Sequence, residues 1–162
     1  MVELKNIKWL ILDVDGVMTD GSLYYSSKGE QYKVFNVKDG LGIIRVKQLG
    51  VKVAVISGRG CDALLVRLNE LGFDEILVNR PDKGSAFNDL YKKYGDTVNN
   101  SACIGDDLPD LELFQMCKIG IAVNDAVAEV KDKADLILSI AGGKGAVREA
   151  CDLIYNAISS TD

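Results

Sequence analysis

Short apolar runs alternate along the chain with segments that carry a helical pattern, and this alternation constrains the fold more than any other feature. Runs of mainly β-branched and aliphatic residues are typical of strands that are covered on both faces. Six such runs span residues 9–14, 51–57, 75–78, 102–105, 119–123 and 136–139. Repeated strand–helix units predict an α/β protein with a doubly wound, Rossmann-like parallel sheet of about six strands.

Helices are predicted between these runs, at residues 41–49, 61–71, 83–94, 109–116, 126–133 and 144–158. The first three are each followed by glycine, which is common just after a helix C-terminus. Residues 21–37 break the rhythm, because two apolar stretches flank a Ser-Ser-Lys-Gly turn, a pattern typical of a β-hairpin. Since no linker, repeat or low-complexity tract interrupts the chain, we predict one domain over residues 1–162, with a hairpin inserted after the first strand.

Polar residues follow the predicted strands at the edge of the sheet where such folds bind ligands. Sites in doubly wound sheets lie beyond the carboxyl ends of the strands, near the point where the strand order reverses. The residues expected there are Asp13, Asp15, Gly16, Ser57, Gly58, Lys83, Asp106, Asp107 and Asp110. Carboxylates from two strand ends can hold Mg²⁺, and a hydroxyl with an ammonium can bind phosphate oxygens. The set therefore favours phosphoryl transfer.

The first acidic pair offers both a nucleophile and a proton carrier. Asp13 and Asp15 are two residues apart on an extended segment, so their side chains point the same way. Gly16 and Gly58 would let the backbone approach a phosphate closely. The chain has no histidine, which excludes Ser-His-Asp and Cys-His catalysis, phosphohistidine chemistry and His-ligated zinc. General acid–base catalysis would therefore have to use carboxylates, lysine, tyrosine or cysteine.

Charge and cysteine content restrict the partners and the compartment. The formal net charge of −5, with scattered lysines, argues against a nucleic-acid or anionic-membrane surface. No apolar run approaches the roughly 20 residues of a transmembrane helix, and Asp13 interrupts the first run too early for a signal peptide. The four cysteines lack Cys-x-x-Cys spacing, so we expect reduced thiols and a cytoplasmic protein.

These residues resemble, in order and spacing, the four motifs of the haloacid dehalogenase-like phosphohydrolases, and the similarity extends over residues 8–159. The motifs read Asp13-x-Asp15-Gly16-Val17-x-Thr19-Asp20, Ser57, Lys83 and Gly105-Asp106-Asp107-x-x-Asp110. The resemblance implies that Asp13 is a nucleophile that forms an aspartyl-phosphate. It also implies that Asp15 protonates the leaving alcohol and then activates water.

The resemblance further implies a role for each remaining motif residue. Mg²⁺ would be held by Asp13, by Asp106 and by the backbone carbonyl of Asp15. Ser57 and Lys83 would bind the phosphoryl group. Two further carboxylates would support the site, Asp110 by orienting the lysine and Asp107 from the outer shell of the metal.

The segments between the motifs are too short for the cap domain that many relatives carry. Asp20 and Ser57 are 37 residues apart, and a hairpin and a helix fill that distance. An open site would leave a phosphoenzyme exposed to water unless a neighbouring subunit covers it. The hairpin also presents an unpaired edge. We therefore expect self-association through residues 23–37, and the resemblance implies a homotetramer.

Within the family the chain is most similar to capless phosphatases of 3-deoxy-D-manno-octulosonate 8-phosphate (KDO 8-phosphate). Relatives that act on the 9-phosphates of nine-carbon acids, N-acylneuraminate and KDN, are the alternative. The supporting segments are residues 35–43, 57–59 and 142–149. The resemblance implies a phosphorylated sugar acid as substrate, with Arg59 and Arg67 as candidates to bind its carboxylate. Arg59 favours the octulosonate.

Two non-catalytic alternatives belong to a different class of protein. A signalling receiver domain also carries an acidic cluster, a hydroxyl and a lysine on a doubly wound sheet. Its phosphorylated aspartate, however, follows the third strand, where this chain has Asn79-Arg80. A regulatory module that kept only the fold would not need the intact acidic residues.

Overall fold

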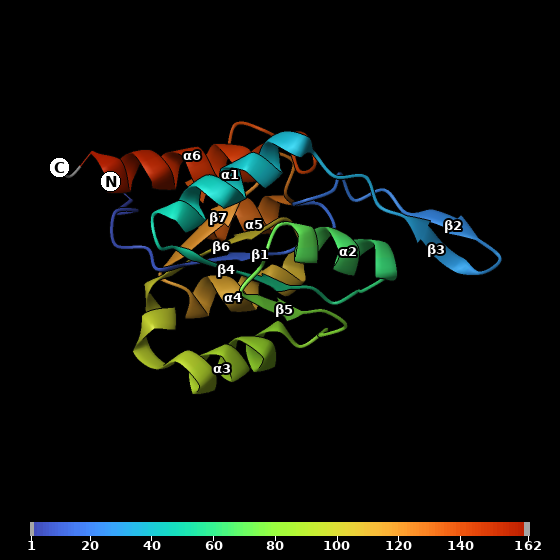
Figure 1. The fold of residues 1–162 in the computed structure, drawn as a ribbon, viewed down its shortest axis with the longest axis horizontal. Coiled ribbons are helices and arrows are strands. Elements are labelled where there is room, and N and C mark those ends of the chain that lie inside the picture. Colours follow the sequence, from blue (N-terminus) through green and yellow to red (C-terminus); the bar gives the residue numbers. More distant parts are fainter. Residues whose placement is uncertain (1, 161–162) are drawn as a thin grey trace.

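The computed structural model describes residues 2–160, except for the side chain of Gln31. Its central sheet has six parallel strands in the order β5-β4-β1-β6-β7-β8 (Figure 1). The strands are β1 (Trp9–Leu12), β4 (Lys52–Ile56), β5 (Glu75–Leu77), β6 (Ser101–Gly105), β7 (Ile119–Ala122) and β8 (Leu136–Ile137). The strand order reverses between β1 and β6, as in other doubly wound sheets. The predicted fold class is confirmed.

Each face of the sheet carries its own hydrophobic core, because side chains alternate along a strand. In β1, Leu10 and Leu12 join one core, while Trp9 and Ile11 join the other. All four are buried, since β1 lies between β4 and β6 at the centre of the sheet. This central position determines where the residues that follow β1 lie.

The helices divide between the two faces. The first core is covered by α1 (Val37–Gln48), α2 (Asp62–Glu70), α5 (Ala128–Lys133) and α6 (Ala146–Ser159), and the second by α3 (Lys83–Tyr94) and α4 (Leu111–Met116). Short 3-10 helices span Gly95–Asn100 and Leu108–Asp110. In Figure 1, α1 and α6 lie above the sheet and α3 below it. None of the helices in the described residues is long and apolar enough to cross a membrane.

The predicted hairpin is present as a separate two-stranded sheet. Its antiparallel strands are β2 (Tyr24–Ser26) and β3 (Gly29–Tyr32). The hairpin projects away from the rest of the molecule (Figure 1). The segments between the sheet strands hold only this hairpin, the α-helices and the two short 3-10 helices, so the described residues contain no cap domain.

The structure departs from the predicted boundaries where the hairpin meets α1. The helix begins at Val37 rather than near residue 41, and the Asn36 side chain caps it by accepting from the Lys38 N–H. Strand β3 ends at Tyr32, so the second hairpin strand is shorter than expected. Residues 33–36 thus form a linker that returns the chain toward the end of β1.

Candidate active site

A pocket of about 320 Å³ lies at the carboxyl edge of the sheet. It is lined by Asp13, Asp15, Ser57, Gly58, Arg59, Pro81, Lys83, Asp106, Asp107, Pro109 and Asp110. The structure thus brings together all of the predicted site residues except Gly16 and Arg67. They converge because the parallel strands that precede them end at the same edge, on both sides of the point where the strand order reverses.

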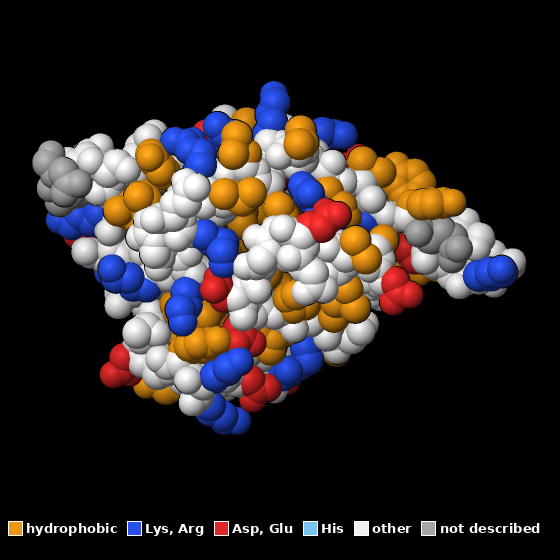
Figure 2. Space-filling view, viewed as in Figure 1, with side chains coloured by type: hydrophobic (Ala, Val, Ile, Leu, Met, Phe, Trp, Pro, Cys, Tyr) orange, Lys and Arg blue, Asp and Glu red, His pale blue; other side chains and the backbone are white. Residues whose placement is uncertain are grey.

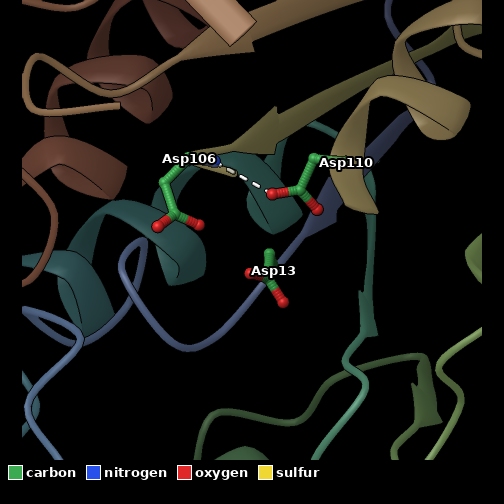
Figure 3. Close-up of side chains that lie close together, drawn as sticks. All are labelled: Asp13, Asp106 and Asp110. Carbon is green, nitrogen blue, oxygen red and sulfur yellow. Dashed lines mark hydrogen bonds between the residues drawn. The ribbon is translucent and has the colours of Figure 1, made fainter. Parts of the chain in front are cut away.

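Three carboxylates face one another at the centre of the pocket. Asp13 follows β1 and Asp106 follows β6, and their carboxylate oxygens lie with one from Asp110 within 4.8 Å of each other (Figure 3). Burial and the neighbouring Asp13 raise the pKa of Asp106 to about 8. Burial and the nearby Asp110 likewise raise the pKa of Asp13 to about 6, against the opposing effect of Lys83. Crowded carboxylates of this kind take up either a proton or a cation.

Asp110 differs from the other two because its oxygens already have donors. One oxygen accepts from Lys83 Nζ at 2.5 Å. The other accepts from the backbone N–H groups of Asp106 (2.9 Å, dashed in Figure 3) and Asp107 (3.3 Å). Asp110 also forms a capping box with Asp107 around the 3-10 helix. Its geometry fits the predicted role of orienting the lysine.

Lys83 enters the pocket from the first turn of α3. The preceding residue, Asp82, caps this helix by accepting from the Ser85 N–H at 2.7 Å. The Lys83 ammonium is buried and lies 2.9 Å from Asp13 Oδ1. Although burial lowers the pKa of Lys83, the Asp13 and Asp110 carboxylates outweigh that effect and raise it. A buried positive charge is therefore held beside Asp13.

Ser57 and Arg59 follow β4 on the other side of the pocket. Ser57 is buried, and its hydroxyl accepts from the Arg59 N–H at 3.3 Å. The Arg59 guanidinium is half exposed and donates to Tyr25 Oη at 2.6 Å and to Glu30 Oε2 at 3.3 Å. Both partners belong to the hairpin. The hairpin therefore reaches the pocket of its own chain.

The linker that follows the hairpin contacts Asp15. Lys33 Nζ donates to Asp15 Oδ1 at 2.6 Å and to Glu30 Oε1 at 2.8 Å. Lys33, Glu30 and Tyr25 were not predicted to take part in the site. The one signal in the sequence is the pair of opposite charges, Glu30 and Lys33, beside the aromatic residues of the second hairpin stretch.

The two glycines predicted to contact phosphate occupy different environments. A Cβ at Gly16 would lie 2.0 Å from Asp106 Oδ2, and its φ of +88° is in the left-handed region. Gly16 does not line the pocket, so it serves the placement of Asp106 rather than close approach of a ligand. Gly58 lines the pocket, and the nearest atom to a Cβ there is Pro81 Cα at 3.7 Å. Since folding does not demand glycine at that position, Gly58 fits a contact with a ligand.

The loop after β1 is supported by a glycine pair from the far end of the sequence. The Gly143 N–H donates to the Val17 carbonyl at 3.0 Å. A Cβ at Gly142 would lie 1.7 Å from the Gly16 carbonyl oxygen. Only glycine permits this backbone-to-backbone approach.

Arg67 does not reach the pocket. It lies on α2, and a Cβ at Gly40 of α1 would be 2.7 Å from Arg67 Nη2. The guanidinium also pairs with Glu70 at 3.5 Å. Because the side chain is turned toward the first turn of α1, its predicted contact with a substrate carboxylate has no support within one chain.

A doubly wound sheet with paired carboxylates after β1 and β6 defines a class of hydrolase. Sequence comparison agrees: the chain belongs to the haloacid dehalogenase-like hydrolase family. The profile of that family matches residues 73–148. These residues include Lys83 and the Asp106–Asp110 motif. The predicted family is confirmed.

Particular members of the family are similar over nearly the whole chain. The 3-deoxy-D-manno-octulosonate 8-phosphate phosphatase KdsC of Haemophilus influenzae is 45% identical over 96% of this chain and 86% of its own length. The cobalt-bound structure of the Haemophilus influenzae enzyme superposes with a TM-score of 0.94 at 44% identity, covering 98% of this chain and 92% of that one. The Moraxella catarrhalis enzyme, in complex with magnesium ion, phosphate ion and KDO, gives a TM-score of 0.92 at 40% identity, with 98% and 91% coverage.

Proposed function

We propose that this chain is a Mg²⁺-dependent phosphatase that converts KDO 8-phosphate to KDO and phosphate through an aspartyl-phosphate on Asp13. The observation that carries the proposal is the carboxylate pair of buried Asp13 and half-buried Asp106, which face each other across the strand-order reversal beside the Lys83 ammonium. The names of the similar enzymes from Haemophilus influenzae and Moraxella catarrhalis support the substrate.

In the first step an Asp13 oxygen attacks phosphorus, and the bond from phosphorus to the sugar oxygen breaks as Asp15 gives that oxygen a proton. In the second step water attacks the phosphorus of the aspartyl-phosphate and gives a proton to Asp15, which releases phosphate and restores Asp13. Lys83 and Ser57 stabilise the charge that spreads over the phosphoryl oxygens. A carboxylate nucleophile with a carboxyl acid needs no histidine.

The donors in the pocket fit a magnesium ion. Asp13 and Asp106 would hold it together with the backbone carbonyl of Asp15, because a hard dication prefers oxygen ligands. The raised pKa values of Asp13 and Asp106 mark negative charge that the protein itself leaves poorly compensated. Asp110 is not available as a metal ligand, since its carboxylate oxygens accept hydrogen bonds from Lys83 and two backbone N–H groups. When bound, Mg²⁺ neutralises charge on the phosphate and on both carboxylates.

Arg59 supports a sugar acid as the substrate. Its guanidinium lies at the rim of the pocket, and a guanidinium fork suits a carboxylate. The phosphate group would lie among Ser57, Gly58 and Lys83. The alternative substrates, the 9-phosphates of nine-carbon sugar acids, are not favoured, because the similar enzymes are named for KDO 8-phosphate.

The test measures phosphate release with KDO 8-phosphate, the nine-carbon 9-phosphates and hexose phosphates, compared by kcat/KM with Mg²⁺ and with a chelator. KDO 8-phosphate should be preferred, and chelation should abolish turnover. Asp13→Asn should lose activity by more than about 1,000-fold because it removes the nucleophile, whereas Asp132→Asn on the exposed face of α5 should not. Preference for hexose phosphates would contradict the role of Arg59, and an active Asp13→Asn variant would contradict the mechanism.

We further propose that the protein works in the cytoplasm as a homo-oligomer, a tetramer formed through the hairpin, with neither nucleic acid nor membrane as a partner. The hairpin supports this proposal because its large apolar side chains are exposed. They are Leu23, Tyr24, Tyr25, Tyr32 and Val34. Figure 2 shows hydrophobic side chains gathered over the hairpin.

A further inference from the structure

A buried lysine lies behind the pocket, on the linker that follows the hairpin. The side chain of Lys33 is only 1% exposed. Its ammonium bridges Asp15 Oδ1 at 2.6 Å and Glu30 Oε1 at 2.8 Å. Burial lowers the pKa of Lys33, but the hydrogen bonds to Asp15 and Glu30 outweigh it and raise that pKa. A fixed positive charge is therefore held against Asp15.

Neither Lys33 nor Glu30 lines the pocket, whereas Asp15 does. The lysine thus approaches the carboxyl group from the side away from the ligand space. It holds one oxygen, Oδ1, while Oδ2 lies 4.0 Å from Arg59 Nε at the pocket rim. A carboxyl group fixed at one oxygen can no longer rotate freely about its Cβ–Cγ bond. The oxygen that remains, Oδ2, lies on the side of Arg59, which lines the pocket together with Asp15.

Orientation matters because a proton donor must lie within hydrogen-bond reach of the atom that it protonates. Small errors in the position of a reacting group reduce rates strongly. Glu30 strengthens the arrangement, because its two oxygens hold Lys33 and Arg59 at once. The hairpin therefore links the group that would protonate the leaving alcohol to the arginine that would bind the substrate carboxylate.

We propose that Lys33 is a positioning residue that orients the Asp15 carboxyl group for proton transfer to the leaving oxygen, with Glu30 as its anchor. The inference rests on the proposed phosphatase function and extends it to the hairpin. It assigns the hairpin a role within its own chain, separate from any contact between subunits.

The test compares two substrates that differ in their need for a proton. The sugar oxygen of KDO 8-phosphate must be protonated as it leaves, whereas the phenolate of p-nitrophenyl phosphate departs readily without a proton. The ratio kcat/KM reports the steps up to formation of the aspartyl-phosphate, so the later attack of water does not enter it. Lys33→Met should lower kcat/KM about 100-fold for KDO 8-phosphate, mainly through kcat. For p-nitrophenyl phosphate, the same substitution should lower kcat/KM less than about 5-fold.

Three further variants distinguish a selective effect from a general loss of folding. Lys33→Arg keeps a donor and should recover most of the activity toward KDO 8-phosphate. Glu30→Gln keeps the size of the anchor and should show the same selective loss at smaller magnitude. Lys28→Met changes an exposed lysine in the hairpin turn and should leave both substrates unchanged. Thermal unfolding of each variant would show that it is folded.

The outcomes separate this inference from the function on which it rests. Selective loss with KDO 8-phosphate that falls on kcat, with recovery in Lys33→Arg, supports it, whereas a selective loss that falls only on KM would point to Arg59 and overturn it. Equal losses with both substrates in folded variants would overturn it and leave the proposed function standing. A wild-type protein that releases phosphate from neither substrate with Mg²⁺ would overturn the proposed function and this inference together.

Discussion

Gly16 shows how one residue without a side chain fixes the geometry of the whole acidic cluster. The Asp106 carboxylate occupies the space that a Cβ at Gly16 would need. Alanine would also strain the backbone, because φ at this position is +88°. The loop that carries Asp13 and the loop that carries Asp106 are thus in direct contact.

Gly16→Ala should lower the free energy of unfolding by about 1–3 kcal/mol and reduce kcat, because Asp106 must move aside. Gly58→Ala is the matched control, since its Cβ would make only an ordinary contact with Pro81. That variant should keep the wild-type melting temperature and raise KM, because the new methyl group intrudes on the pocket. Thermal unfolding and steady-state kinetics measure both. A Gly16→Ala variant with wild-type stability and kcat would contradict this account.

Asp39 is a buried carboxyl group outside the pocket. It lies on α1 and accepts from the Arg148 N–H at 2.8 Å, so it caps the start of α6 from a neighbouring helix. Gly145, which precedes α6, has no side chain to do so. Burial raises the pKa of Asp39 to about 6, against the opposing effects of its hydrogen bond to Arg148 and the Arg67 charge.

Asp39→Asn should change how stability depends on pH. The folded protein binds this proton more tightly than the unfolded chain, whose pKa is near 3.8. The stabilisation is therefore complete below that value and is lost as pH rises through about 6, a difference of about 3 kcal/mol. Urea unfolding should show that wild type loses stability relative to Asp39→Asn as the pH rises from about 4 to about 6. A difference that stays constant with pH would contradict the burial of a titrating carboxyl group.

At the scale of elements, α3 carries the pocket lysine in its first residue and depends on the cap that precedes it. Asp82→Ala removes the acceptor for the Ser85 N–H and should cost about 1 kcal/mol of stability. The same change should raise KM, because Lys83 begins the helix. Asp82→Asn retains an acceptor and should behave nearly as wild type in urea unfolding and kinetics. Equal effects of both substitutions would indicate that the charge of Asp82, rather than its cap, matters.

The strands and most helices could be predicted because their patterns are local. The start of α1 could not, since Gly40 and Gly42 lower the helix propensity of the segment. The structure explains both glycines through distant contacts. A Cβ at Gly40 would lie 2.7 Å from Arg67 Nη2, and one at Gly42 would lie 3.0 Å from Cys151 Cβ. Tertiary packing, which a single sequence does not display, overrides local preference there.

Likewise, some residues of the candidate site could be predicted from the sequence and others could not. Residues directly after strands could be placed from the sequence because parallel strands bring their ends together. Lys33 could not, because its contact with Asp15 depends on how the linker after β3 returns toward β1. Arg67 was placed near the substrate by resemblance alone, and one chain gives that position no support.

At the scale of the whole molecule, the hairpin presents apolar surface that one chain leaves exposed. Tyr32 is 69% exposed and Val34 is 59% exposed. An isolated two-stranded ribbon is marginally stable in water, and its free edges favour pairing with another chain. Association through this surface would both cover the apolar side chains and hold the linker that carries Lys33.

Light scattering at micromolar concentration should therefore give a mass several times the 17.6 kDa of one chain. Replacing Tyr32 and Val34 together by serine should shift the protein toward monomer, because it removes apolar area from the hairpin. Val66 on α2 is as exposed as Val34 but lies outside the hairpin. Val66→Ser should therefore leave the mass unchanged. A monomeric wild type would contradict the proposed assembly.

The contact of Gly142 and Gly143 with the loop after β1 has a consequence for synthesis on the ribosome. The glycines that hold the loop of Asp13 follow it by about 130 residues. At about 5–20 residues per second, the ribosome adds them roughly 6–26 s after the aspartate. A nascent chain therefore carries Asp13 for seconds before the backbone that supports its loop exists.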